Sequence, residues 1–418
     1  MTTPAAAQLG LEYKPLEAPQ LNDPFPFYAR LRHEAPVTFA PAFQLWLVSR
    51  YADVQAALRD PKRFSSRDIL RPPVDLPPEM LEYLKEAGYS PEYPLLGDDP
   101  PSHTRIRGLV GKAFSVASVA AMETRIREIA RSYVDALLRA GPRADVVAGL
   151  SFPLPMHIIT TLLGIPASDG EKLKGWCADE NLFFVPHLPP EARMHSARGV
   201  AAFRHYLRAM VEERQKNPRP DDFLTSLIQA RLEGERPLNL VELINLSSVI
   251  VFAGHETTTN LMSSALLYLL RHPTAWQELR ANPAALPNAI DEVLRFDTPV
   301  VGMMRTATED VELSSTQVPA GARLLLLFAS ANRDEAIFPE GAERLDIHRA
   351  NANRHIGFGH GAHYCVGAQL AKLEMRIALE MLLERLPNPR LVPEKPVPYL
   401  PALIHRGPRQ LWVEWDAA

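Results

Sequence analysis

The chain has 418 residues, of which 46% are hydrophobic and 22% are charged, and its formal net charge is −4. This composition is typical of globular proteins and excludes a largely disordered chain, and the small negative charge excludes the class of strongly basic nucleic-acid binders. The sequence has only two cysteines, which excludes a disulfide framework and any metal site built from four cysteines.

The N-terminal part of the chain is predicted to mix short strands with helices. The N-terminus lacks a basic segment followed by an apolar one, so no signal peptide is expected, and no apolar run is long enough to predict a membrane span. Strands are expected at 37–39 and 45–48, inside a β-rich portion of about 30–70. The proline-rich loop 72–101 contains one expected helix at 78–87. Apolar residues at helical spacing predict further helices at 103–114, 118–139, 169–184, 190–216 and 221–231.

The clearest predicted helix runs from about Leu240 to His272. Asn239 is a suitable N-cap, and Glu242 three residues later completes a capping box. Pro273 is expected to end the helix. At a rise of about 1.5 Å per residue the helix is about 50 Å long. Its apolar composition indicates that it crosses the protein interior.

The C-terminal part of the chain is predicted to contain one more long helix. The expected elements are a helix at 287–296, strands at 311–313 and 323–328, an irregular stretch to 364, a helix at 367–385 and short strands over 391–415. No internal repeat or low-complexity linker divides the chain. We therefore predict a single, mainly α domain with a minor β part over 1–418. Its helical bulk covers about 100–385, and its C-terminal short strands cover about 390–416.

Cys365 lies in the segment Phe358-Gly-His-Gly-Ala-His-Tyr-Cys-Val-Gly367. A lone cysteine is most often a buried and inert side chain, as we expect for Cys177. Around Cys365, however, glycines allow tight turns and the close approach of a flat ligand, and the following helix would stabilise a thiolate by its N-terminus. The alternative is a zinc site formed by His355, His360, His363 and Cys365. That set fits no common zinc spacing, so an axial haem thiolate is favoured.

A second group of polar residues lies in the middle of the long helix, in Ala253-Gly-His-Glu-Thr-Thr258. A glycine, two β-branched residues and an acid close together predict a local kink or a widened turn. Glu256 and Thr257 share a mainly apolar face, where an acid beside an alcohol indicates proton delivery into a dry pocket. His255-Glu256 begins like a zinc-protease motif, but position 259 is not histidine, so that class of enzyme is excluded.

A third motif is Glu292-Val-Leu-Arg295, which alone is a common helical ion pair. With Arg349, or alternatively Arg333, it is predicted to form a buried network that fixes the loop before the cysteine. We expect its role to be structural.

Together, the three motifs resemble the signature motifs of cytochrome P-450, the family of haem-thiolate monooxygenases, in the same order and at the usual separations. The resemblance covers nearly the whole chain, and the cysteine motif is its most specific part. It implies a triangular prism of helices, with haem b between the long central helix and the cysteine loop and helix. It also implies that Cys365 is the thiolate ligand of the haem iron and that Glu256 and Thr257 are catalytic, since they match the pair that helps to protonate dioxygen.

By the same resemblance, a set of residues is expected to bind the haem. These residues are His103, Arg107, Ala253, Arg305, Phe358, Gly359, His363, Cys365 and Gly367. His103, Arg107, Arg305 and His363 match positions that usually hold the two haem propionates. This match is chemically sensible, because buried carboxylates need cationic hydrogen-bond donors.

The resemblance is to the soluble bacterial type of this family, which implies a cytoplasmic monomer of secondary metabolism. Such enzymes take electrons from NAD(P)H through a separate ferredoxin, or a flavodoxin, and its reductase, and neither nucleic acid nor membrane is expected as a partner. The electron donor should dock on the cysteine side, where basic residues would steer an acidic partner. The candidates are Arg105, Lys112, Arg354, Lys372 and Arg376. For any one of them alone, an ordinary solvated charge is the favoured explanation.

The expected substrate pocket is mostly apolar, which predicts hydroxylation or epoxidation of a lipophilic small molecule of unidentified class. Its predicted lining is the loop 72–101 together with Leu182, Phe183, Val249, Ala253, Val300, Val301, Leu403 and Ile404. Proline breaks around 186–190 predict a hinged lid. Two alternatives stay open, a peroxide-driven peroxygenase, which typically lacks the acid–alcohol pair, and a non-catalytic protein that binds haem or another ligand.

Overall fold

The computed structural model describes residues 4–67, 69, 76–91, 93–183, 188–220, 222–339 and 341–416. Its contacts divide the chain into two compact units. The first unit comprises Met1–Ser65, Ala121–Pro155 and Glu256–Ala418, and the second comprises Ser66–Ala120 and Met156–His255. The single domain expected over the whole chain stays a prediction.

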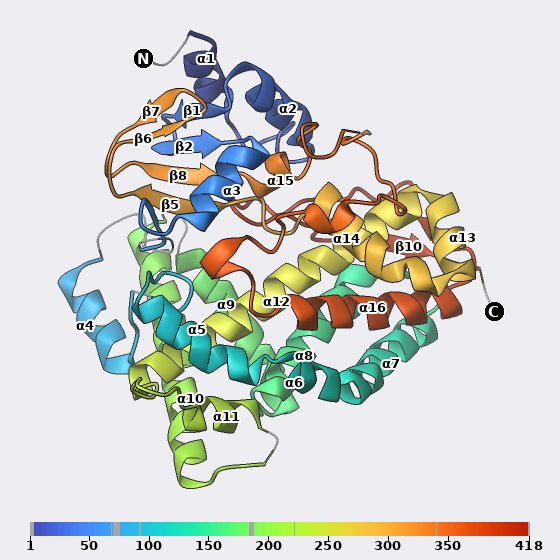
Figure 1. The fold of residues 1–418 in the computed structure, drawn as a ribbon. Helices are drawn as coiled ribbons and strands as arrows, with labels where there is room; N and C mark the ends of the chain where they lie inside the picture. Colours follow the sequence, from blue (N-terminus) through green and yellow to red (C-terminus); the bar gives the residue numbers. More distant parts are fainter. Residues whose placement is uncertain are drawn as a thin grey trace. The chain divides into compact units, whose positions relative to one another are not determined.

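A five-stranded sheet in the first unit joins segments that are far apart in the sequence (Figure 1). Its order is β1 (Val37–Ala40), β2 (Leu45–Val48), β8 (Arg323–Leu326), β5 (Met303–Ala307) and β3 (Phe64–Ser65). β2 and β8 are parallel, with Trp46 opposite Leu324, and the other pairs are antiparallel. Along β8 the side chains alternate, so that Leu324 and Leu326 join one apolar core and Leu325 and Leu327 join another.

Two smaller sheets complete the β part of the first unit. The C-terminal strand β10 (Trp412–Glu414) lies between β4 (Arg143–Asp145) and β9 (Arg390–Leu391), and β6 (Val311–Leu313) pairs with β7 (Thr316–Val318). The strands predicted at 45–48 and 311–313 are confirmed residue for residue. The predicted C-terminal strands are also present, although each of them is short.

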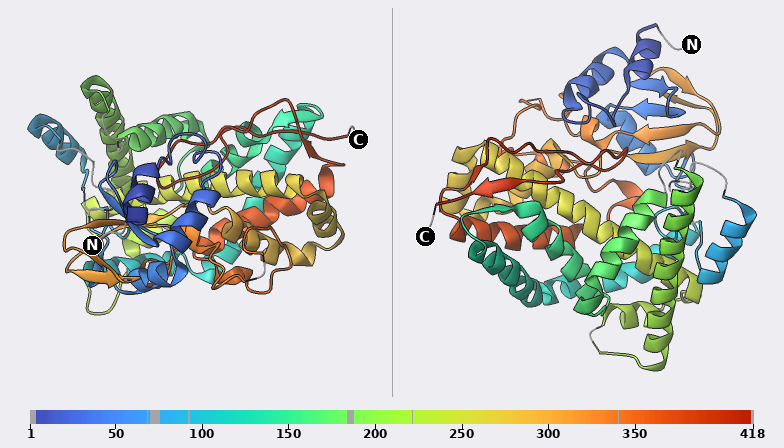
Figure 2. Two further views of the ribbon diagram at one scale, coloured as in Figure 1. Left: turned by 90° about the horizontal axis from the view of Figure 1, so that it is seen from above. Right: turned by 180° about the vertical axis from the view of Figure 1, so that it is seen from behind.

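Three helices of the first unit pack around α16, the helix that follows the cysteine loop. The helices of this unit are α1 (Pro4–Glu12), α2 (Phe25–Glu34), α3 (Tyr51–Arg59), α7 (Glu123–Arg139), α13 (Pro273–Ala281), α14 (Leu286–Phe296), α15 (Phe328–Ala331) and α16 (Ala368–Arg385). α16 packs against α7, α13 and α14, and Figures 1 and 2 show it alongside α7. The short 3-10 helices η4 (Ala352–Arg354) and η5 (Gly361–His363) lie in the loop before it, and η3 (Pro283–Ala285) precedes α14.

Helices are the regular elements of the second unit within its described residues. Its helices are α4 (Pro78–Ala87), α5 (Ser102–Ala113), α6 (Val116–Ala121), α8 (Pro153–Leu162), η2 (Ala167–Asp169), α9 (Gly170–Phe183), α10 (Pro190–Lys216) and α11 (Phe223–Gln229); α6 and α8 extend across the unit boundary. α10 packs against α9, α4 and α11. Among them lies a fully buried ion pair, in which Arg204 Nη2 is 2.6 Å from Glu180 Oε1 and Ser248 Oγ donates to Glu180 Oε2 at 3.0 Å. The helices predicted at 78–87 and 190–216 have these bounds in the structure.

The long helix α12 (Leu240–Arg271) contributes its first half to the second unit and its second half to the first unit. Its predicted capping box is confirmed, because Asn239 N–H donates to Glu242 Oε2 at 2.8 Å and Glu242 N–H donates to Asn239 Oδ1 at 2.9 Å. The helix ends before Pro273, as predicted. None of the described helices is long and apolar enough to cross a membrane.

Of the kink or widened turn expected at 253–258, the widened turn is wrong, because α12 is α-helical throughout this segment, and the kink stays a prediction. Packing explains the difference, since the Ile159 side chain fills the space beside Gly254 and comes within 2.9 Å of where a Cβ would stand. Such contacts support a regular helix against the weak propensities of individual residues. A single π-helical turn occurs instead at Val147–Ser151.

Candidate active site

The loop before α16 holds Cys365 in a tight and glycine-rich turn. The Cys365 backbone N–H donates to the Phe358 carbonyl oxygen at 2.9 Å, and this bond closes the loop. Gly359 and Gly361 have φ angles of 72° and 69°, which side chains rarely tolerate. At Gly361 a Cβ would also stand 2.5 Å from the Leu58 carbonyl oxygen of α3. Glycine is therefore required where this loop passes α3.

The Cys365 side chain is half-buried, and α16 begins three residues after it. A Cβ built on Gly367 would stand 4.0 Å from Cys365 Sγ. The sulfur therefore faces a glycine at the start of a helix, where amide N–H groups and the helix dipole favour its thiolate form. A single cysteine thiolate in this environment has the chemistry of the protein ligand that a haem iron would need.

A zinc site in this loop does not fit the structure. Among the described residues, no three His, Cys, Asp or Glu side chains are grouped so that they could hold a metal ion. His360 instead accepts a hydrogen bond from Arg59 Nε at 2.8 Å, and His355 Nε2 lies 3.4 Å from Asp291 Oδ1. These two histidines therefore have partners other than a shared metal.

The four residues expected at the haem propionates are divided between the units. In the first unit, Arg305 of β5 is buried and donates to the Met304 carbonyl oxygen at 2.7 Å, and His363 lies half-buried in η5. In the second unit, His103 of α5 is buried and Arg107 of the same helix is half-buried. Donors of this type at low exposure match the chemistry that buried carboxylates need.

Glu256 is a half-buried acid of α12. Removal from water raises the pKa of its carboxyl above the ordinary value, and the nearby Asn260 amide and the positive charge of Arg409 oppose this rise only in part. Gly407 packs against the Asn260 side chain and leaves no room for a Cβ. Thr257, the next residue, is half-buried. An acid that holds its proton beside an alcohol can donate a proton to a neighbouring group.

The geometry brings Glu292, Arg295 and Arg349 together in one buried network. Arg295 Nε is 2.7 Å from Glu292 Oε2, and Arg349 Nε is 3.2 Å from Glu292 Oε1. Arg295 also donates to the carbonyl oxygens of Asn332, Ala342 and Arg344. Arg333, the alternative partner, instead donates to the Phe296 carbonyl oxygen and to Glu343. Arg349 is thus the residue that joins the pair.

The predicted pocket residues form two groups, one in each unit. In the first unit, Val301 N–H donates to the Ile404 carbonyl oxygen at 2.8 Å, and Val300 pairs with His405 next to Leu403 and Ile404. In the second unit, Phe183 and Val249 belong to one apolar core, Leu182 is half-buried and Ala253 is exposed. Residues 72–75 and 92 of the predicted loop and residues 186–187 of the predicted lid lie outside the described residues.

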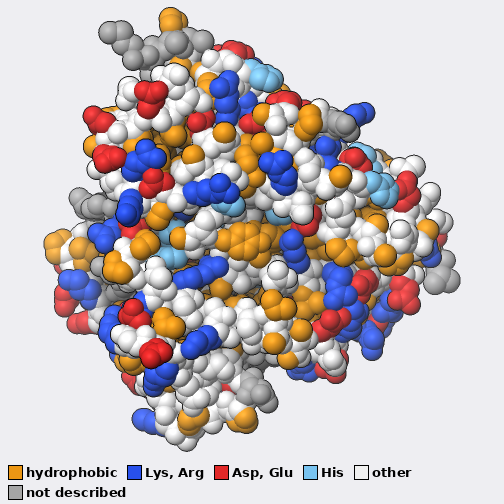
Figure 3. Space-filling model, viewed as in Figure 1, with side chains coloured by type: hydrophobic (Ala, Val, Ile, Leu, Met, Phe, Trp, Pro, Cys, Tyr) orange, Lys and Arg blue, Asp and Glu red, His pale blue; other side chains and the backbone are white. Residues whose placement is uncertain are grey.

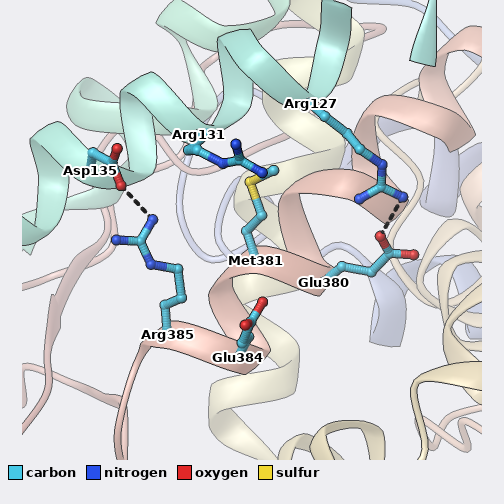
Figure 4. A pocket seen from close by; sticks show the side chains of 7 residues that line it. All are labelled: Arg127, Arg131, Asp135, Glu380, Met381, Glu384 and Arg385. Carbon is cyan, nitrogen blue, oxygen red and sulfur yellow. Dashed lines mark hydrogen bonds and ion pairs between the residues drawn. The ribbon is translucent and has the colours of Figure 1, made fainter. Parts of the chain in front are cut away.

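A surface cavity of about 440 Å³ lies along α7 and α16 and contains none of the predicted site residues. Figure 4 shows charged side chains around it, with ion pairs between Asp135 and Arg385 and between Arg127 and Glu380. This cavity is therefore a charged groove and not the predicted substrate pocket. Basic and acidic side chains are also interspersed over the face seen in Figure 3.

Four of the five basic residues expected at the electron donor have partners within the chain. Arg105 pairs with Glu242, Lys112 donates to the Arg231 carbonyl oxygen, Lys372 pairs with Asp291, and Arg376 pairs with Glu123 and Glu380. Only Arg354 has an exposed side chain without a recorded side-chain bond among the described residues. The sequence analysis missed Asp291 and Arg409, although Asp291 directly precedes the Glu-x-x-Arg motif.

Comparison with known proteins identifies what this arrangement is similar to. The family model for cytochrome P-450 matches residues 41–398. The chain is 36% identical to the cytochrome P-450 monooxygenase PikC of Streptomyces venezuelae, over 94% of this chain and 91% of PikC. It is 35% identical to mycinamicin IV hydroxylase/epoxidase of Micromonospora griseorubida, over 93% and 94% of the two chains. The haem domain of a Tepidiphilus thermophilus cytochrome P-450 superposes with a TM-score of 0.87, at 31% identity and over 98% of each chain.

Proposed function

The chain belongs to the cytochrome P-450 family of haem-dependent monooxygenases, and on that premise we propose that it hydroxylates or epoxidises a lipophilic small molecule. The observation that carries the proposal is the loop that closes on Cys365 through the bond between Cys365 N–H and the Phe358 carbonyl oxygen. When bound, haem b would supply the activation of dioxygen and the transfer of one oxygen atom to the substrate. Everything else in the reaction depends on what the chain binds, positions and protonates.

We assign Cys365 as the thiolate that holds the haem iron, with Phe358, Gly359 and Gly367 beside the ring. Arg305 and His363 of the first unit would bind propionates, and we propose the same role for His103 and Arg107 of the second unit. The negative charge of a thiolate must be stabilised at the sulfur. The N-terminus of α16, directly after Gly367, would stabilise this charge. Ala253 has no side chain beyond Cβ, which suits close approach of a flat ring.

Glu256 and Thr257 are assigned to proton delivery. The raised pKa of Glu256 keeps its carboxyl protonated at pH values where an exposed glutamate is ionised. The proton is therefore held next to Thr257, the following residue on the same helix. The charge of Arg409 limits this rise, and the carboxyl can therefore release its proton and take up another. A peroxide-driven enzyme needs no such delivery, so the acid–alcohol pair favours the use of dioxygen.

The substrate is proposed to be lipophilic because the eight predicted pocket residues are apolar. The names of two relatives, mycinamicin IV hydroxylase/epoxidase and cyclomarin C epoxidase, describe oxidation of bacterial secondary metabolites. By analogy with them, we propose a secondary metabolite as the substrate. The stereochemistry and position of oxidation follow from the shape of the pocket and not from the shared motifs.

Electrons are proposed to come from NAD(P)H through a separate ferredoxin, with a flavodoxin as the alternative. Tyr364, directly before Cys365, is 41% exposed, and Arg354 is exposed in the same loop. An exposed aromatic side chain and an exposed cation in one loop suit a small acidic partner. We further propose that the protein is a cytoplasmic monomer that binds neither membrane nor nucleic acid.

The proposed function is tested by turnover with NAD(P)H and a surrogate ferredoxin and reductase, over a library of lipophilic compounds. Compounds that shift the haem spectrum on binding are first selected and then assayed for an oxygenated product. Product that depends on NAD(P)H and dioxygen supports the proposal. Product formed only with added peroxide would identify a peroxygenase, and binding without any product would identify a non-catalytic protein.

A further inference from the structure

A charged cluster lies at the base of the cysteine loop and takes no part in the function proposed above. Lys372 of α16 places its Nζ 2.5 Å from Asp291 Oδ1 of α14. The same Oδ1 lies 3.4 Å from Nε2 of His355, which is the residue two before Gly357 in the loop. One carboxylate oxygen therefore joins two helices to the chain that leads into the cysteine turn.

The hydrogen bonds of His355 indicate which of its nitrogens carries the proton. Gly357 N–H donates to His355 Nδ1 at 3.1 Å, so Nδ1 is an acceptor and carries no hydrogen. Nε2 then carries the hydrogen and donates it to Asp291. The side chain is only 4% exposed, and this burial lowers the pKa of the imidazole, which is neutral as a result. A neutral His355 thus joins Asp291 to the Gly357 backbone.

Phe358 continues the connection from this cluster to Cys365. Its ring centroid lies 5.7 Å from Lys372 Nζ and 5.7 Å from the His355 ring, and its carbonyl oxygen accepts the Cys365 N–H at 2.9 Å. The cation over the ring and the imidazole beside it hold the aromatic side chain from two directions. A movement of Lys372 or Asp291 is therefore passed through Phe358 to the backbone of the sulfur ligand.

We propose that Lys372, Asp291 and His355 are positioning residues for Cys365 and that their charge balance sets the reduction potential of the haem that Cys365 would hold. The proposal rests on the proposed function, because it requires a thiolate-ligated haem. Lys372 and Asp291 carry opposite charges at the base of the cysteine loop, where Lys372 contacts the Phe358 ring, in a half-buried place where charges are only partly screened. Reduction adds one negative charge to the site, so a nearby cation favours reduction and a nearby anion opposes it.

Because Lys372 and Asp291 carry opposite charges, removing one or the other should shift the reduction potential in opposite directions. A simple loss of folding would not shift it in opposite directions. In Lys372→Met, the carboxylate of Asp291 loses its cation, so the equilibrium constant for one-electron reduction should fall at least threefold. In Asp291→Asn, the ammonium of Lys372 loses its anion, and the constant should rise at least threefold. Threefold corresponds to about 28 mV, because tenfold is about 59 mV for one electron. Lys372→Arg keeps the charge and should stay within twofold of the wild type.

The test is a spectroelectrochemical titration of the purified holoenzyme and its variants, together with the carbon-monoxide difference spectrum of each reduced protein. Arg385→Met is the matched control, since Arg385 also lies on α16 in an ion pair, with Asp135, but outside the cysteine loop. Its potential should equal that of the wild type. Shifts of opposite sign in Lys372→Met and Asp291→Asn, with recovery in Lys372→Arg, support the proposal.

Equal potentials in all variants, or shifts of one sign in both, would overturn it. A failure of the proposed function looks different. It would appear in the wild type as a reduced carbon-monoxide spectrum without the signature of thiolate ligation, and this result would refute both the proposed function and the positioning role. If either charge variant loses haem, His355→Asn supplies the second measurement. The amide oxygen of the asparagine can still accept the Gly357 N–H, but no imidazole reaches Asp291. We therefore expect a larger fraction of the reduced protein to lack thiolate ligation. An unchanged fraction would refute the positioning role.

Discussion

Cys365 donates its backbone N–H to the carbonyl oxygen of Phe358, seven residues earlier, at 2.9 Å. This bond fixes both ends of a loop in which Gly359 and Gly361 have left-handed backbone conformations. The sulfur is thereby held half-buried at the start of α16. The predictions below follow from this loop and from the groups that support it.

Replacing Thr257 by alanine should uncouple electron use from product formation. Without the alcohol, protons reach dioxygen less efficiently, and we expect product per NAD(P)H to fall roughly 10- to 100-fold while peroxide rises, in keeping with the contribution of general acids and bases. Product and peroxide are measured in the same reaction. Thr259→Ala is the control, because Thr259 Oγ1 has no hydrogen-bond partner among the described residues. Intact coupling in Thr257→Ala would remove Thr257 from proton delivery.

Glu256→Gln should slow the same step and change its pH dependence. The raised pKa of Glu256 means that the wild type keeps the proton to a higher pH than an ordinary glutamate, and its rate should decline as the pH rises through that pKa. Glutamine cannot titrate, so this limb should disappear from the profile of product formation against pH. If the limb persists in the variant, the titrating group is not Glu256.

Arg295→Ala should cost stability and haem incorporation and not simply rate. Arg295 and Glu292 are both fully buried, and removing one partner leaves an uncompensated buried charge, which costs about 3–5 kcal/mol. We expect a lower midpoint of denaturant unfolding and a lower ratio of haem to protein. Arg385→Ala breaks the more exposed pair with Asp135 and should cost about 1 kcal/mol or less. A stable, fully loaded Arg295→Ala protein would refute the structural role.

Glu374→Gln should stabilise the protein increasingly as the pH rises. Burial raises the pKa of Glu374 well above its ordinary value of 4.5, so the native carboxyl is neutral while the unfolded one ionises. The stability of the wild type with the neutral Glu374 carboxyl is fully present below pH 4.5. It is lost by about 1.4 kcal/mol per pH unit as the pH rises toward the pKa of Glu374 in the native state. The unfolding free energies of the variant and wild type should therefore diverge above pH 4.5. Glu384→Gln, at an exposed site on the same helix, is the control for the substitution itself, and parallel curves for Glu374→Gln and the wild type would contradict the assignment.

Local signals predicted much of the fold. The Asn239–Glu242 capping box and the strand Leu45–Val48 depend on neighbours in the sequence, and both are confirmed. The widened turn in α12 was wrong because the Ile159 side chain packs against Gly254, a contact that no local propensity contains. The pairing of β2 with β8, almost 280 positions apart, is likewise outside the reach of local patterns.

The site was predictable where one motif carries the chemistry. The spacing around Cys365 predicted both the glycine turn and the following helix, which the structure contains. The choice between Arg349 and Arg333 depended on long-range packing, and only the structure brings Arg349 to Glu292. Lys372 was expected on the surface, yet it pairs with Asp291. An ion pair between two helices cannot be read from either helix alone.

The central claim is that Cys365 is the thiolate ligand of a haem, and one measurement tests it most directly. The reduced carbon-monoxide difference spectrum is recorded for the wild type, for Cys365→Ala and for Cys177→Ala, the second cysteine, which is buried in α9 of the second unit. We predict the band typical of thiolate-ligated haem in the wild type and in Cys177→Ala, and its complete loss in Cys365→Ala. An unchanged band in Cys365→Ala would contradict the account.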